Sequence, residues 1–378
     1  MERGSRVRAL LAGFALLAAA GCGETDDIEQ VQSAISGGWV ALPLGQGWSN
    51  YNTANPPAIG RVNGILTLRG AVKGDGTATT HVFTLPPGYR PMYGERLELR
   101  TVTAFNTGGT VYVEIDHTAR IYEDGVSTSS LGPNAKFFTS LDGISFDTTA
   151  EDATHLIDDV SADGNWAGLY GHRLQGMETS ANVKNVGGFV RFQGWLTKNP
   201  GGDPNSMFLF QLPSQFRPGQ SVWVPTTLCG GGGTQQTYGR LNIVANTGNV
   251  YVQPANGNYA AANCSVSLEN ISFALSQTTQ TLNFQFGWNP YNQRPVRVRL
   301  SGGVVRFQGS IDDGTATVFA NMLPTNMRPP VNVYLQADSW NAAHARIVVT
   351  PDGTMFFDTP SLSVASGFLS LDGVSFGL

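Results

Sequence analysis

Three short phrases occur three times each along this chain, always in the same order, and this repetition limits the possible folds more than any other feature. The first phrase reads "GILTLRG" (64–70), "GFVRFQG" (188–194) and "GVVRFQG" (303–309). The second reads "LPPGYRP" (85–91), "LPSQFRP" (212–218) and "LPTNMRP" (323–329). The third reads "SLDGISF" (140–146), "SLENISF" (267–273) and "SLDGVSF" (370–376).

The spacing of these phrases indicates whole domains rather than short solenoid units. The last glycine of the first phrase recurs as Gly70, Gly194 and Gly309, which are 124 and 115 residues apart. A further element opens each copy: "GWSNY" (47–51), "NWAGLY" (165–170) and "GWNPY" (287–291). We therefore predict three tandem repeats, named repeat 1 (37–147), repeat 2 (152–276) and repeat 3 (280–378).

Within each repeat the residue pattern favours short strands. Apolar and polar residues alternate in the first phrase, and turn pairs such as Thr247-Gly248 and Asp352-Gly353 separate alternating runs. Charged residues make up only 13 % of the chain, which also holds 46 Gly and 20 Pro. We predict an all-β chain of three antiparallel, jelly-roll-like β-sandwiches, each with about eight to ten strands and no amphipathic helix. The third phrase is predicted to be a closing strand with Leu141, Gly143 and Ser145 on one face.

The first residues have the pattern of a secretory signal peptide. Three arginines precede an uncharged apolar run, Ala9–Ala20, which is too short to span a bilayer as a helix. The following "AAGC" resembles the lipobox of bacterial lipoproteins, which implies a signal peptide over 1–21 and lipidation of Cys22. The alternative is ordinary cleavage after Ala20, which leaves a free thiol. An acidic, polar tether over 22–36 precedes the first repeat.

The remaining two cysteines form an even pair in an exported chain. Cys229 and Cys264 are therefore expected to form a disulfide. Closing this loop stabilises a fold by about 4 kcal/mol in the chain-entropy model. A redox or metal role is disfavoured because the pair has no CxxC spacing and no clustered histidines. No metal site or cofactor is predicted.

Net charge argues against nucleic acid as a partner. The chain has a formal charge of −5, and removing residues 1–21, with three Arg and one Glu, makes it −7. Nucleic-acid binding favours a basic face instead. The only membrane contact expected is the lipid anchor, so the protein is predicted to lie at the bacterial outer membrane or cell surface.

The run of phrases in repeat 1, from "GGWVALPLGQGWSNY" through "LPPGYRP" to "SLDGISF", resembles the C-terminal β-sandwich modules of bacteriophage tail fibre and baseplate receptor-binding proteins. The resemblance implies modules that form homotrimers and bind cell-surface glycans. This chain differs in having a lipoprotein-like signal and three copies in tandem. Either the three copies pack around a pseudo-threefold axis within one chain, or they are separate beads on a string.

Aromatic pairs recur in the opening element of each repeat and are the candidate ligand-binding residues. They could stack on the apolar face of a sugar ring, or they could pack the end of each sandwich. The pairs are Trp48 with Tyr51, Trp166 with Tyr170, and Trp288 with Tyr291.

Other candidate groups are interpreted as structural. Arg90, Arg217 and Arg328 in the second phrase could bind acidic groups, but we expect each to bond a backbone carbonyl or a carboxylate in its own domain. The "GVSFG" around Ser375 matches the hydrolase G-x-S-x-G pattern but lacks the required following helix, so Ser375 is predicted to be a strand residue.

We therefore predict no catalytic residues and a non-enzymatic role. The expected function is recognition of a surface polysaccharide, or of an envelope protein, at the cell envelope. A structural or assembly module without a small ligand is the alternative, and a polysaccharide hydrolase is the weaker one.

Overall fold

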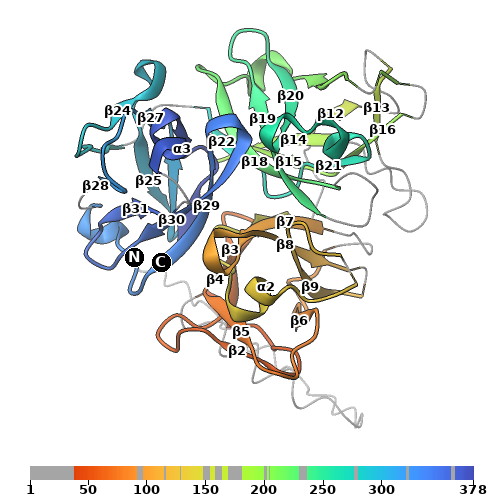
Figure 1. Ribbon diagram of the computed structural model, residues 1–378, viewed down its shortest axis with the longest axis vertical. Helices are drawn as coiled ribbons and strands as arrows, with labels where there is room; N and C mark the ends of the chain where they lie inside the picture. Colours follow the sequence, from red (N-terminus) through yellow and green to blue (C-terminus); the bar gives the residue numbers. More distant parts are fainter. Residues whose placement is uncertain are drawn as a thin grey trace, which may run out of the picture. The chain divides into compact units, whose positions relative to one another are not determined.

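A computed structural model describes residues 38–91, 97–114, 116–127, 129–147, 154–157, 164–168, 181–199, 202–203, 205–229, 236–275, 280–320, 323–358 and 362–378. Residues 39–378 form one compact unit. The described part is all-β, as predicted, and its strands fall into three consecutive sets in the same order (Figure 1).

Each repeat contributes eleven strands to the described structure. Repeat 1 holds β1 (Trp39–Ala41), β2 (Trp48–Asn50), β3 (Ala58–Val62), β4 (Ile65–Arg69), β5 (Ala71–Gly74), β6 (His81–Thr84), β7 (Leu97–Val102), β8 (Gly108–Val113), β9 (Thr118–Glu123), β10 (Thr139–Ser140) and β11 (Ser145–Phe146). Repeat 2 holds β12 (Thr154–Ile157), β13 (Trp166–Gly168), β14 (Ala181–Val186), β15 (Phe189–Gln193), β16 (Trp195–Lys198), β17 (Phe208–Gln211), β18 (Val222–Leu228), β19 (Thr237–Ile243), β20 (Asn249–Pro254), β21 (Ser265–Ser267) and β22 (Ser272–Ala274). Repeat 3 holds β23 (Gln280–Thr281), β24 (Asn289–Pro290), β25 (Arg297–Ser301), β26 (Val304–Gln308), β27 (Ser310–Asp312), β28 (Val318–Ala320), β29 (Val333–Ser339), β30 (Ala343–Val349), β31 (Met355–Phe357), β32 (Leu369–Ser370) and β33 (Ser375–Gly377).

Two antiparallel sheets make up each sandwich. In repeat 3 a four-stranded sheet (β23-β25-β26-β33) accompanies a seven-stranded sheet (β24-β27-β32-β29-β30-β31-β28), and repeat 2 has the same order. In repeat 1 the larger sheet is divided into β10-β5-β2 and β6-β9-β8-β7, with an isolated bridge from Thr103 to Thr139. Buried apolar side chains of repeat 2 and of repeat 3 form separate core clusters. Each of these two repeats therefore has its own hydrophobic core.

Short helical turns connect the strands. Two α-helices, α2 (Pro133–Phe137) and α3 (Leu362–Gly367), occupy equivalent places before β10 and β32. The remaining turns are 3-10 helices: η1 (Ala104–Asn106), η2 (Ser214–Phe216), η3 (Ala255–Gly257), η4 (Tyr259–Ala262), η5 (Tyr291–Gln293), η6 (Thr325–Met327) and η7 (Trp340–Ala342). The helices α2 and α3 were not predicted, because five or six residues are too few to show a helical period. The predicted hairpins at Gly248 and Gly353 are confirmed, and both glycines have positive φ.

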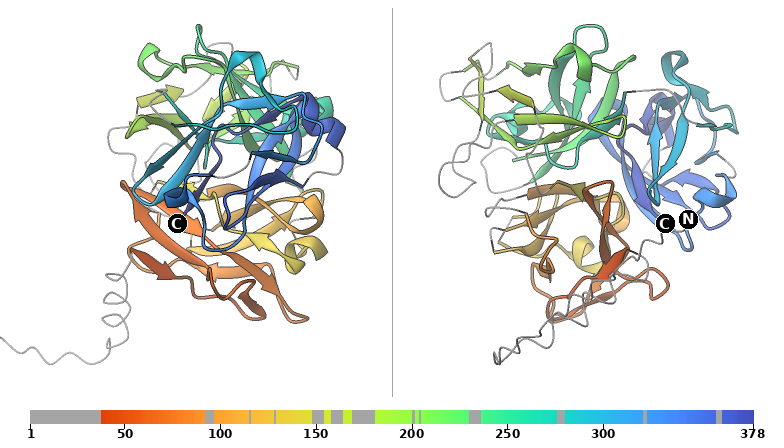
Figure 2. Two further views of the ribbon diagram at one scale, coloured as in Figure 1. Left: turned by 90° about the vertical axis from the view of Figure 1, so that its left-hand side faces the viewer. Right: turned by 180° about the vertical axis from the view of Figure 1, so that it is seen from behind.

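The three repeats pack around a pseudo-threefold axis. The equivalent strands β7, β18 and β29, labelled in Figure 1, contact one another pairwise, and Figure 2 shows the three repeats from two further sides. Hydrogen bonds join equivalent positions in cyclic order. Ser267 Oγ of repeat 2 donates to the Glu98 carbonyl of repeat 1 (3.0 Å), and Ser370 Oγ of repeat 3 donates to the Trp223 carbonyl of repeat 2 (2.7 Å). These contacts exclude the beads-on-a-string arrangement.

The third phrase forms a corner beside this axis, which corrects the prediction of one continuous strand. Its first residue ends a strand of one sheet and its last two residues lie in a strand of the other, as in β10 and β11, with a turn at Asp142-Gly143 between them. The turn requires a left-handed residue, which is Gly143 (φ 83°), Asn270 (φ 62°) or Gly373 (φ 77°). The residues of the phrase therefore do not alternate between the two faces of one strand, so the prediction that Leu141, Gly143 and Ser145 share a strand face is wrong.

These turns touch the closing strand of a neighbouring repeat. Asn270 Oδ1 accepts the Ser145 N–H at 2.8 Å. A Cβ on Gly373 would lie 3.0 Å from the Ser272 carbonyl oxygen, and one on Gly143 would lie 3.1 Å from the Ser375 carbonyl oxygen. In all three repeats the phrase therefore lies at a contact with a neighbouring repeat.

We expect Gly373→Ala to destabilise the fold by about 2–3 kcal/mol, because a left-handed alanine and a crowded carbonyl both cost free energy. Gly303→Ala is the matched control, since Gly303 has φ 80° and open space around its Cβ position. It should cost only about 1 kcal/mol. Urea unfolding of both variants measures the difference, and equal losses would contradict the close inter-repeat contact.

Candidate functional site

The three tryptophans predicted to bind ligand are buried in their own repeats. Trp48, Trp166 and Trp288 are 7 %, 0 % and 4 % exposed. The Nε1–H of Trp48 donates to the Thr79 carbonyl, and that of Trp288 donates to the Ala316 carbonyl, both at 2.9 Å. The indole rings therefore pack the end of each sandwich and are not available for stacking on a ligand.

Tyr51 and Tyr291 occupy equivalent edges where two repeats meet. The Tyr51 ring lies 4.7 Å from Phe138, centroid to centroid, and Phe138 lies 4.9 Å from Tyr334 of repeat 3. All these ring contacts are edge-to-face. The same row recurs at the other junction: the Tyr291 ring lies 4.8 Å from Phe368, which lies 5.2 Å from Trp223 of repeat 2.

A hollow of about 330 Å³, here called the Tyr51 groove, lies beside the first row. Tyr51 is 41 % exposed, so it can offer part of its ring to a ligand. Amide side chains lie around it on both sides of the junction between repeats 1 and 3. The residues that define the groove are Tyr51, Asn52, Asn55, Asn332, Tyr334 and Pro351.

An equivalent hollow of about 360 Å³, the Tyr291 groove, lies at the junction of repeats 2 and 3. It again combines aromatic rings with amide and hydroxyl groups. The residues that define it are Gln220, Ser221, Trp223, Asn242, Tyr291, Asn292 and Arg294. Two junctions of one chain thus present the same combination of groups.

The two grooves differ in the charge beneath them. Asp142 lines the Tyr51 groove, and burial raises its pKa to about 7 despite its hydrogen bond from Gly70 N–H (2.9 Å) and the attraction of Arg69. At the equivalent place in repeat 3, Asp372 forms a buried bidentate ion pair with Arg294. The Tyr51 groove therefore has a carboxyl with a raised pKa, while the Tyr291 groove has a paired guanidinium.

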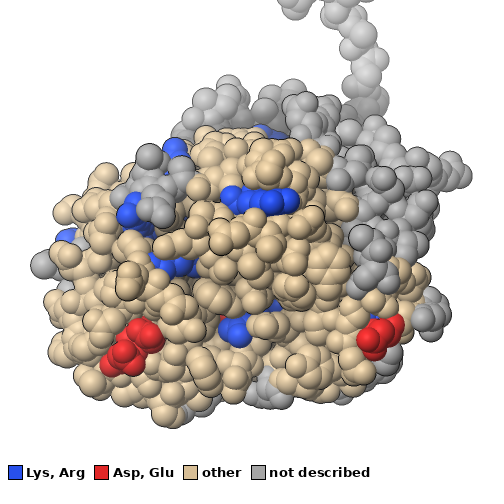
Figure 3. Space-filling model, turned by 90° about the horizontal axis from the view of Figure 1, so that it is seen from above, with Lys and Arg blue, Asp and Glu red and all other residues tan. Residues whose placement is uncertain are grey.

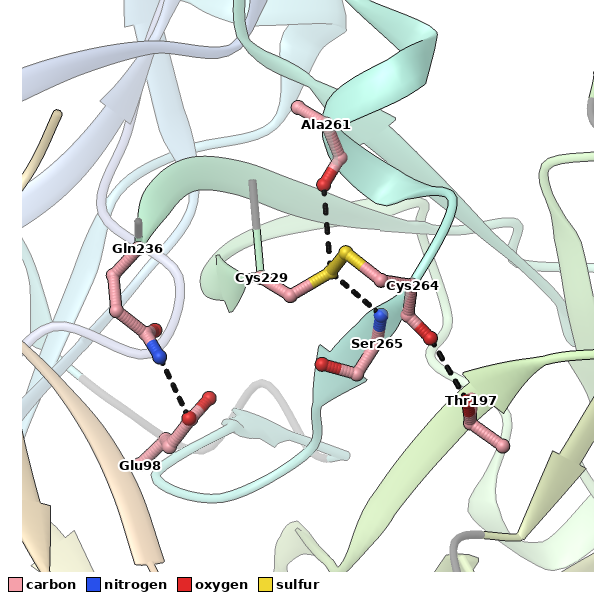
Figure 4. The surroundings of a disulfide bond; sticks show 7 residues. All are labelled: Glu98, Thr197, Cys229, Gln236, Ala261, Cys264 and Ser265. Atoms are coloured by element: carbon pink, nitrogen blue, oxygen red, sulfur yellow. Dashed lines mark hydrogen bonds between the residues drawn. A yellow bond between two sulfur atoms is a disulfide. The ribbon is translucent and has the colours of Figure 1, made fainter. Parts of the chain in front are cut away.

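The third junction, between repeats 1 and 2, is built differently. Ser265 and Glu98 take the places of the phenylalanine and the partner aromatic residue, and Gln236 Nε2 donates to Glu98 Oε1 at 2.8 Å (Figure 4). The predicted disulfide between Cys229 and Cys264 is confirmed nearby, with Cα atoms 6.0 Å apart. The equivalent tyrosine, Tyr170, lies outside the described residues.

The arginines of the second phrase support their own repeats, as expected. The Nε–H groups of Arg90, Arg217 and Arg328 donate to the carbonyls of Leu85, Leu212 and Leu323, at 2.9, 2.9 and 2.7 Å. Ser375 is a buried residue of strand β33, which confirms the prediction of a strand residue. Within the described ranges, no three His, Cys, Asp or Glu side chains gather to hold a metal.

The amide residues of the grooves were not predicted. Asn55, Asn332, Gln220 and Asn242 lie outside the repeated phrases, and tertiary packing brings them to the tyrosines. One local signal was present: an asparagine follows the tyrosine in "YN" at 51–52 and again at 291–292.

The segment 1–21, Cys22 and the whole of the segment 22–36 lie outside the described residues, so the predicted signal peptide, lipidation and tether stay predictions. In the part of the chain that is described, no helix has the length and apolar character needed to cross a bilayer. No family model matches the chain, and no curated protein or solved structure matches it significantly.

Proposed function

We propose that this chain is a non-enzymatic binding protein of the bacterial cell envelope, anchored through lipidated Cys22, that recognises a surface glycan. Two equivalent junction grooves carry the proposal, because each pairs a tyrosine ring with a surround of amides. Aromatic rings suit the apolar face of a pyranose, and amides both donate to and accept from its hydroxyls.

The sparsely charged surface is consistent with a neutral, hydroxyl-rich ligand. Figure 3 shows one face of the molecule, on which the acidic and basic side chains are few and separated by uncharged residues. The resemblance to phage receptor-binding modules supports the same reading. The resemblance implies modules that form trimers, and three tandem repeats would provide such a trimer within one chain.

The test is a glycan array probed with the purified full-length protein and with Tyr51→Ala/Tyr291→Ala. We expect array binding by the wild type and a loss of about tenfold in the double variant, because each groove loses one aromatic contact. Phe286→Ala is the matched control, because Phe286 is an exposed aromatic residue that lines neither groove.

A double variant that keeps its fold and still binds with wild-type affinity would contradict the groove proposal. Failure of the wild type to bind any glycan would favour the structural or assembly role. Circular dichroism of each variant establishes that the fold is kept.

A further inference from the structure

A larger hollow of about 540 Å³ lies at the junction of repeats 2 and 3, and none of its lining residues belongs to the two tyrosine grooves. We call it the Arg240 groove. The residues that define it are Met207, Arg240, Tyr251, Gln253, Tyr259 and Asn341. Its volume is in the range of small-molecule sites.

Arg240 is held in a fixed position within this groove. Its Nη1 donates to Asp338 Oδ2 of repeat 3 at 2.8 Å, and its Nε–H donates to Gln253 Oε1 at 2.7 Å. Because the oxygen of Gln253 accepts from Arg240, the amide nitrogen of Gln253 is its remaining polar end, and it can only donate. The groove therefore presents oriented N–H donors.

The groove contains a cation and no acidic lining residue among those described. Asp338 is fully buried behind Arg240 and does not line the hollow. The hollow around the equivalent Arg346 is different, because Asp358 lines it together with Arg346, Phe105 and Phe137. A carboxylate ligand would be repelled by Asp358 but meets no such group in the Arg240 groove.

Aromatic rings complete the site. Tyr259 is 51 % exposed, and Tyr251 is held by an edge-to-face contact with Phe208 at 5.7 Å between ring centroids. A ring face beside an oriented guanidinium suits a sugar that carries a carboxylate, since charge-assisted hydrogen bonds to Arg are strong. We propose that the Arg240 groove binds an acidic saccharide, of the uronic-acid class.

This proposal goes beyond the function assigned to the tyrosine grooves, since it concerns separate residues and a charged ligand. The probes are trigalacturonic acid and the neutral maltotriose, titrated calorimetrically into the purified full-length protein at low and at high salt. We expect trigalacturonate to bind, to weaken at high salt, and to bind better than maltotriose.

Gln253→Glu is the decisive variant, because it keeps the size of the side chain and adds a carboxylate to the groove. We expect it to weaken trigalacturonate binding about tenfold or more. Tyr259→Ala, at an exposed position, should also weaken it, whereas Phe286→Ala should not.

Equal binding of the two trisaccharides, or trigalacturonate affinity unchanged in Gln253→Glu, would overturn the proposal, as would absence of binding. Array binding, which the Tyr51→Ala/Tyr291→Ala variant probes, is scored separately. Either proposal can therefore fail without the other.

Discussion

Asp372→Ala is expected to lower the free energy of unfolding by about 3–5 kcal/mol, because it leaves a buried arginine without its partner. The Asp372 side chain is fully buried, pairs with Arg294 through both oxygens, and also accepts the Gly309 N–H at 3.0 Å. Urea unfolding of the full-length protein at neutral pH measures the loss.

The double variant Arg294→Met/Asp372→Asn is the matched control. It removes both charges, and the asparagine oxygen can still accept from Gly309. We expect it to recover most of the lost stability, since replacing a whole buried ion pair is often close to neutral. A double variant as unstable as Asp372→Ala would show that the ion pair is not the cause.

Stability is expected to fall as the pH rises from about 4 to about 7. Burial raises the pKa of Asp142 to about 7. Burial also raises the pKa of Asp338 to about 6, although the positive charge of Arg240 partly opposes this rise. In this window the folded chain keeps protons that the unfolded chain has released, so the stability present at acid pH is lost as the pH rises. Asp142 alone is expected to change the free energy of unfolding by about 4 kcal/mol across this pH range.

Urea unfolding across this pH range checks the prediction, with Asp142→Asn as the comparison. The other groups with shifted pKa values either titrate outside this pH range or are the same in the wild type and in the variant. Asp75, Asp116 and Asp352 have lowered pKa values and titrate below the window, while His117, whose pKa is also lowered, contributes equally to both proteins. Asp142→Asn should remove the larger part of the fall and leave the smaller part due to Asp338, and a wild-type profile that rises towards neutral pH would contradict the assignment.

Repetition and alternation predicted the all-β class and the three-part plan, and the even pair of cysteines predicted the disulfide. A repeated strand or turn can be recognised from the sequence because its residues are adjacent in the chain. The same local view misread the third phrase as one strand, since the positive φ of Gly143 depends on a corner between two sheets. Asn270 holds the same conformation in repeat 2, so glycine alone did not mark the turn.

The carboxylates show why sequence could not predict the site. Asp142, Glu269 and Asp372 are equivalent, and each accepts the N–H of the last glycine of the first phrase, at 2.9, 2.7 and 3.0 Å. Their environments still differ, because Asn55 lies beside Asp142 where Arg294 pairs with Asp372. Arg294 and Asp372 are 78 positions apart in the chain, so no local sequence pattern predicts that they pair.

Hydrogen exchange of the full-length protein, with and without the oligosaccharide that the array selects, tests most directly whether the tyrosine grooves at the repeat junctions bind the glycan. The account predicts paired protection: residues 51–55 together with 330–334, and residues 220–223 together with 291–294. Protection confined to segments of a single repeat, or lying wholly outside these four segments, would contradict it.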